Sequence, residues 1–168
     1  MRRFVPILLI GIGISLFIAS GGRLYINNLI AHPAAIALPD QLADLEMVES
    51  ITGPQAASDF ADLHDKQFLL TSGAIGIYGD HKLTLWAAGA PLDFLAERML
   101  VAMREKISQG GSPFRLVEQF DQNGRTVYVL EGMGQIHYYF QSNNLVIWLA
   151  AEPALADAAI KQILEAYP

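Results

Sequence analysis

An uncharged apolar run near the N-terminus constrains this chain more than any other feature. Residues 4–22 carry no charge, and Arg2 and Arg3 stand directly before them. A transmembrane helix needs about 20 apolar residues, with about 17 at the short end of the range. Positive charges at the start of such a run favour an N-terminus that stays in the cytoplasm. The sequence therefore predicts a single-pass anchor held in the lipid bilayer by residues 4–20, with a periplasmic or extracellular domain after it.

A cleaved signal peptide is the alternative, because it has the same charged start and apolar middle. Ala19 and Gly21 supply small residues for cleavage, although the apolar middle is long for a signal peptide. We favour an anchor, or an uncleaved signal, over residues 1–22. Residues 23–39 are then predicted to be a juxtamembrane linker, and residues 40–168 an extracytoplasmic domain.

The predicted domain is acidic. After Arg23 the chain has eight Lys and Arg residues against seventeen Asp and Glu residues. A domain of this sign without a basic run repels phosphate backbones, so nucleic acid is not an expected partner. The chain also has no cysteine, which excludes disulfides, thiolate zinc sites and cysteine nucleophiles.

Apolar periodicity and turn residues predict an α+β domain. Helices are predicted to begin at Pro54, Pro91 and Pro153, since each proline precedes apolar residues at helical spacing. The stretch from Asp40 to Ile51 fits either a helix face or an edge strand. Turns at residues 79–81, 121–124 and 142–144 predict hairpins, between strands at residues 74–78, 82–88, 114–120, 126–131, 136–141 and 145–150. We expect an N-terminal transmembrane helix followed by an antiparallel sheet with helices packed mainly on one face.

Two hairpin-helix units of the sequence resemble each other. A shift of 62 positions places Trp86 on Trp148 and Pro91 on Pro153. The match predicts a structural repeat in which each tryptophan is largely buried under the helix that follows it, where a large aromatic ring fixes a helix to a sheet.

Met133 and His137 are the candidate metal ligands. Close to Glu131, they offer a thioether and an imidazole, which suit copper. In the alternative that we favour, Met133 fills a turn and His137 lies on the solvent face of a strand. The other histidines (His32, His64 and His81) have no metal-ligand spacing.

An acidic stripe follows the helix predicted from Pro54. Asp59, Asp62 and Asp65 recur every three residues. We interpret the stripe as a solvated helix face, because no loop of alternating oxygen ligands for calcium is present.

Aromatic residues gather in the last three predicted strands, and strand alternation places them on both faces. They are either core on both sides of the sheet, which we favour, or an exposed interaction surface on one side. Tyr128, His137 and Tyr139 are the candidates for that surface.

The sequence contains no reaction-specific signature in the domain; the motif Gly-x-Ser-x-Gly, for example, is absent. We therefore predict no catalytic residue and no cofactor. The leading hypothesis is a non-enzymatic, membrane-anchored extracytoplasmic module that binds another envelope protein or a small ligand. Two alternatives stay open: a copper-type metal-handling protein of the envelope, and a small hydrolase whose acidic residues converge only in the folded chain.

Overall fold

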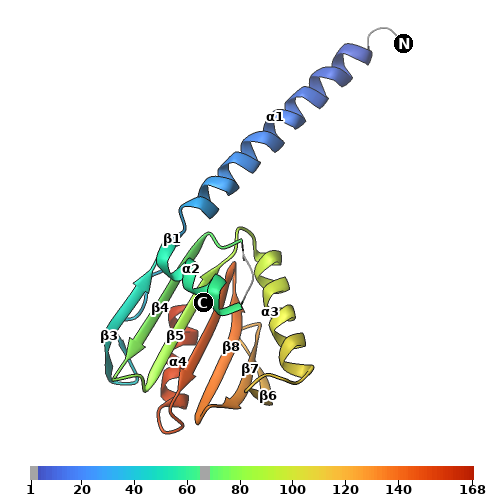
Figure 1. Cartoon of the computed structure of the whole chain (residues 1–168). Coiled ribbons are helices and arrows are strands. Elements are labelled where there is room, and N and C mark those ends of the chain that lie inside the picture. Colours follow the sequence, from blue (N-terminus) through green and yellow to red (C-terminus); the bar gives the residue numbers. More distant parts are fainter. Residues whose placement is uncertain (1–3, 65–68) are drawn as a thin grey trace.

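The computed structural model describes residues 4–64 and 69–168, with side chains for residues 8–62 and 69–168. Arg2, Arg3 and Asp65, which entered the predictions above, lie outside the described residues. A long N-terminal helix projects from one end of an α+β domain (Figure 1).

Helix α1 spans Phe4–Ala31. Its 28 residues give a length of about 42 Å at 1.5 Å per residue, which exceeds the hydrocarbon core of about 30 Å. The helix continues through the first part of the predicted linker and ends two residues before Pro33, which cannot continue a helix. The chain then enters the sheet at once, because β1 (Ala34–Ala35) pairs in parallel with the start of β4 (Ser72–Tyr78).

The strands of the described residues form one nine-stranded sheet. Each pair of neighbouring strands is antiparallel, except for the parallel pair β1–β4. The order across the sheet is β2-β3-β4-β5-β9-β8-β7-β6, so β6 forms one edge. The strands are β2 (Gln41–Leu42), β3 (Leu45–Thr52), β4 (Ser72–Tyr78), β5 (Leu83–Gly89), β6 (Arg115–Gln122), β7 (Arg125–Gly132), β8 (Gln135–Ser142) and β9 (Leu145–Ala151).

Tight turns connect the hairpins where the sequence predicted them. Asn123 and Gly124 both have positive φ between β6 and β7, as a two-residue turn that follows the strand twist requires. The stretch from Asp40 to Ile51, left open between helix and strand, contains the short β2 and most of β3.

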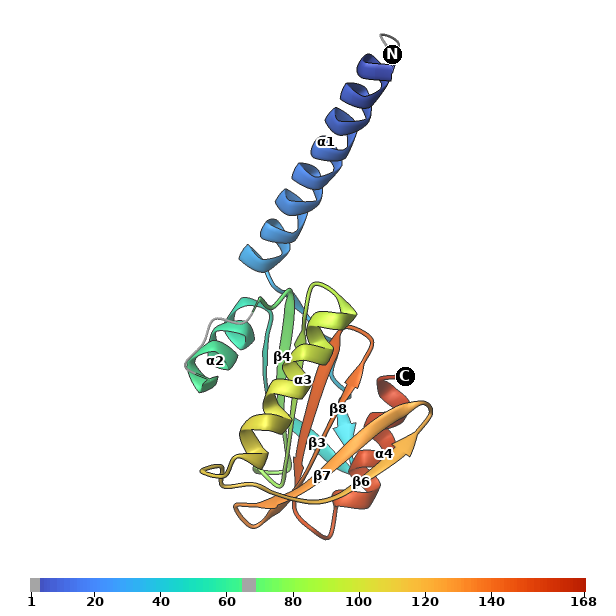
Figure 2. The ribbon, with the colours of Figure 1, turned by 90° about the vertical axis from the view of Figure 1, so that its right-hand side faces the viewer.

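Three helices cover the two faces of the sheet (Figure 2). They are α2 (Pro54–His64), α3 (Asp93–Ser108) and α4 (Ala156–Ala166). Helices α2 and α3 pack on the face that carries Trp86 and Trp148. Helix α4 packs on the other face, against strand residues that include Leu85 and Leu149. The predicted α+β class, with an antiparallel sheet and helices mainly on one face, is confirmed.

The repeat is only partly present. The hairpins β4–β5 and β8–β9 lie side by side, with Trp86 opposite Trp148 in the central strand pair. Their helices, however, go to opposite faces. Trp148 packs under α3 and not under α4, because α3 covers the face of β8 and β9 that carries Trp148. Helix α4 covers the opposite face. Both tryptophans have intermediate exposure. The prediction that each tryptophan packs under the helix that follows it is wrong for Trp148.

Tyrosine hydroxyls bind the segment before β2 to the α4 face. Tyr78 donates to the carbonyl oxygen of Pro39 over 2.8 Å, and Tyr167 donates to that of Ala37 over 2.7 Å. Part of the predicted linker is therefore packed on the domain.

Candidate functional site

An aromatic row crosses the sheet beneath α3. Tyr128, Tyr139 and Trp148 are cross-strand neighbours on β7, β8 and β9. Their rings stack, with centroids 4.8 Å apart for the two tyrosines and 5.4 Å apart for Tyr139 and Trp148. Tyr128 and Tyr139 are 6% and 1% exposed. The structure therefore places Tyr128 and Tyr139, two candidates for an exposed interaction surface, in the core beneath α3. A core position for these aromatic residues is the interpretation that we favour from the sequence.

His137 lies next to this row and is only 4% exposed. The indole Nε1–H of Trp148 donates to His137 Nδ1 over 3.1 Å, and His137 Nε2 lies 3.1 Å from the carbonyl oxygen of Gly132. An indole nitrogen only donates and a carbonyl oxygen only accepts. These partners therefore require a neutral imidazole with its hydrogen on Nε2.

The expectation that His137 faces solvent is wrong, because the ring of Phe114 covers it at 4.7 Å between centroids. Burial lowers the pKa of His137, and the hydrogen bond to Gly132 opposes this shift. Both ring nitrogens are already engaged, so a metal ion could bind only by displacing Trp148 or Gly132. Met133 is 77% exposed in the β7–β8 turn. Within the described residues, no group of three or more His, Cys, Asp or Glu side chains could hold a metal ion.

The acidic stripe belongs to α2. Asp59 accepts a hydrogen bond from Gln55 one helical turn earlier, over 2.9 Å, and Asp62 is exposed. His32 and His81 are exposed as well. We find no arrangement of these described side chains that would build a binding site.

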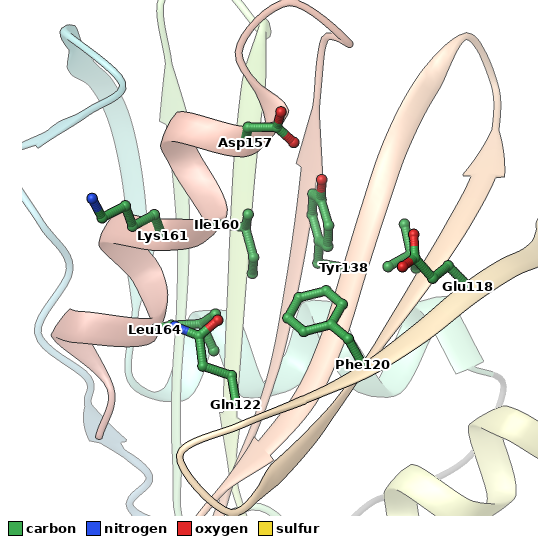
Figure 3. A pocket seen from close by; sticks show the side chains of 9 residues that line it. Glu118, Phe120, Gln122, Tyr138, Asp157, Ile160, Lys161 and Leu164 are labelled. Atoms are coloured by element: carbon green, nitrogen blue, oxygen red, sulfur yellow. The ribbon is translucent and has the colours of Figure 1, made fainter.

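A groove of about 390 Å³ lies on the opposite face, between α4 and the β6 end of the sheet (Figure 3). Strand β6 and helix α4 form its two sides, and Val129 and Tyr138 come from the strands between them. We call it the α4–β6 groove. Its lining consists of Glu118, Phe120, Gln122, Val129, Tyr138, Asp157, Ile160, Lys161 and Leu164.

Tyr138 is the unusual member of this lining. It is 6% exposed, yet its hydroxyl forms no hydrogen bond with any described residue, and it points to the end of the groove where Asp157 and Glu118 lie on either side (Figure 3). Burial, and then the negative charges of Asp157 and Glu118, raise the pKa of Tyr138. The hydroxyl is thus a neutral group between two carboxylates.

Sequence reasoning missed this groove. Glu118, Tyr138 and Asp157 belong to β6, β8 and α4, and only the strand order together with the face chosen by α4 brings them together. The alternation of Tyr138 with Tyr139 was visible in the sequence, but it does not tell which face stays open. Comparisons with protein-family models, curated proteins and solved structures give no match to this chain.

Proposed function

We propose that α1 anchors the chain in a membrane as a single-pass protein and holds an extracytoplasmic domain that binds another envelope protein or a small ligand. The main support is the exposure of the helix. The stretch Leu8–Ala31 is long and apolar enough to span a bilayer, and its most apolar window is 0% buried. A water-exposed helix of this composition would lack a partner for its apolar surface.

The end of the domain next to α1 adds support. The β1–β4 pairing fixes the exit of α1 beside Ser72, which itself pairs with Gly89. Close to these strand ends along the chain, Leu69, Leu92 and Phe94 are 56%, 46% and 54% exposed. Apolar side chains near the exit of an anchor are suited to the interfacial layer of a bilayer.

Binding is the activity that the α4–β6 groove supports best. Its volume of about 390 Å³ falls within the range of small-ligand sites, which combine apolar walls with a few polar groups. Both Glu118 and Asp157 are solvent-exposed, whereas a carboxyl group that serves as a general acid is usually shielded from water to raise its pKa. This favours a binding module over the hydrolase.

Cysteine labelling tests the topology, because the chain has no cysteine of its own. We expect an exposed probe, Glu152→Cys, to react with a membrane-impermeant maleimide in cells whose outer barrier has been removed but whose cytoplasmic membrane is intact. Reaction only after lysis of that membrane would contradict the proposed topology. The intact mass of the membrane-bound protein should include residues 1–22; a mass that lacks them would show a cleaved signal instead of an anchor.

A further inference from the structure

We propose that the α4–β6 groove binds a primary ammonium group on an aliphatic stem, the chemistry of a lysine side chain or of a free aliphatic amine. The proposal rests on the binding function inferred above and names the ligand class of that groove. Two exposed carboxylates, of Glu118 and Asp157, and the hydroxyl of Tyr138 carry it. The Tyr138 side chain is 6% exposed, and its hydroxyl opens into the same end of the groove without a hydrogen-bond partner among the described residues.

The two carboxylates have no cationic partner in the part of the chain that the structure describes. The salt bridge between Arg115 and Glu131 is the only one among the described residues. Lys161 follows Asp157 by one helical turn, which would allow a pair, but the two form no such bridge, and Figure 3 shows the Lys161 side chain directed away from this end. A cation that enters the groove therefore meets two negative charges without displacing a protein cation.

Tyr138 makes the end of the groove more specific than a pair of surface acids. Most of the Tyr138 side chain is buried, but its hydroxyl faces the open end of the groove and forms no hydrogen bond with a described residue, so a ligand can reach it. An ammonium group has three N–H donors. Glu118, Asp157 and the Tyr138 oxygen supply three acceptors from three separate elements, β6, α4 and β8.

The rest of the groove suits an aliphatic stem. Phe120 and Ile160 line opposite sides, from β6 and α4. Methylene groups gain free energy when they leave water for such walls. An anion would meet repulsion from the carboxylates. A divalent cation is less suited to this site, because the groove offers two carboxylates and calcium takes six to eight oxygen ligands.

The test uses the full-length protein in micelles of a non-ionic detergent and follows backbone amide resonances by NMR. The probe is Nα-acetyl-lysine N-methylamide. We expect saturable shifts confined to β6, β8 and α4, with a Kd on the order of 1 mM, as suits a small ligand in an open site. The Nε-acetylated form of the same probe keeps the stem but loses the charge, and it should not bind.

Substitutions test the individual acceptors. Glu118→Gln and Asp157→Asn should each weaken binding by about tenfold or more, because hydrogen bonds to charged groups carry that much free energy. Tyr138→Phe keeps the ring and should weaken binding by about fivefold. Glu165→Gln is the matched control: it removes the same charge from an exposed position on α4 outside the groove and should change the Kd by less than about twofold.

Three results would overturn the proposal: no saturable shift, equal binding of the acetylated probe, or tighter binding of Ca²⁺ than of the lysine probe at the same carboxylates. Comparison with n-butylamine separates the two sources of the ligand. Equal affinities would indicate a free amine, and tighter binding of a lysine within a short peptide would indicate a protein segment. Binding in micelles does not depend on topology, so the labelling experiment can fail without affecting this test, and the reverse is also true.

Discussion

Protonation of His137 should make the fold sensitive to mild acid. The ring is neutral, 4% exposed, and held between the Trp148 indole and the Gly132 carbonyl. A proton on Nδ1 would place an N–H group against the Trp148 N–H, in a site with little water to separate them. Replacing His137 by Gln removes the titration, and the Gln side chain keeps both a donor and an acceptor.

The sign and size follow from linkage. Burial lowers the pKa of His137 in the folded state below its ordinary value of 6.5, so below that pH the unfolded chain binds more protons than the folded one. The contribution of neutral His137 to the free energy of unfolding is therefore complete above pH 6.5. It is lost as the pH falls towards the pKa of His137 in the folded state. The loss from this one residue cannot exceed about 1.4 kcal/mol per pH unit.

Denaturant unfolding of the full-length protein in micelles, between about pH 8 and pH 5, measures this slope. We expect the free energy of unfolding of the unsubstituted protein to fall below about pH 6.5 relative to that of His137→Gln. Substitution of His81, which is exposed in the β4–β5 turn, should leave the slope unchanged. Parallel curves for the unsubstituted protein and His137→Gln would refute the assignment of a buried neutral imidazole.

Two further substitutions probe the same cluster by denaturant unfolding. Trp148→Phe removes the indole N–H that donates to His137 Nδ1 and should cost about 1–3 kcal/mol, because a buried acceptor is left unpaired; a cost near zero would show that the bond contributes nothing. Gly132→Ala should cost about 1–3 kcal/mol through overpacking, since its Cβ would lie 2.7 Å from the carbonyl oxygen of Pro113 and 2.6 Å from Cδ1 of Phe114. An alanine variant as stable as the original would mean that the segment around Phe114 moves freely.

The local structure of the domain was largely predictable because its signals are local. Asn123-Gly124 and Gly79-Asp80-His81 connect the strands of two hairpins. They have the positive φ values that such tight turns require. The β7–β8 turn at Met133-Gly134 has the same backbone signature, but the sequence predicted no hairpin turn there. Met133 concealed the signal, because a non-glycine residue with positive φ is uncommon outside Asn, Asp and His.

Long-range features were not predictable from the same patterns. The periodicity of α4 identifies its apolar side but not the sheet face that receives it, and the apparent repeat with α3 suggested the wrong face for this helix. The position of His137 depends on Phe114, which precedes β6 and covers the ring from outside its own hairpin. For the same reason the sequence indicated a solvated histidine where the structure has a buried one.

Tyr138 and Tyr139 show why a ligand site is better sought on the α4 face. They are neighbours on β8, so their side chains lie on opposite faces of the sheet. Tyr139 stacks on Tyr128 and on Trp148, and α3 closes that face over them. Tyr138 is just as deeply placed in the sheet, but α4 and β6 leave the groove open in front of its hydroxyl. A ligand under α3 would have to break stacked aromatic contacts, whereas a ligand in the α4–β6 groove could bind the Tyr138 hydroxyl without displacing any described partner.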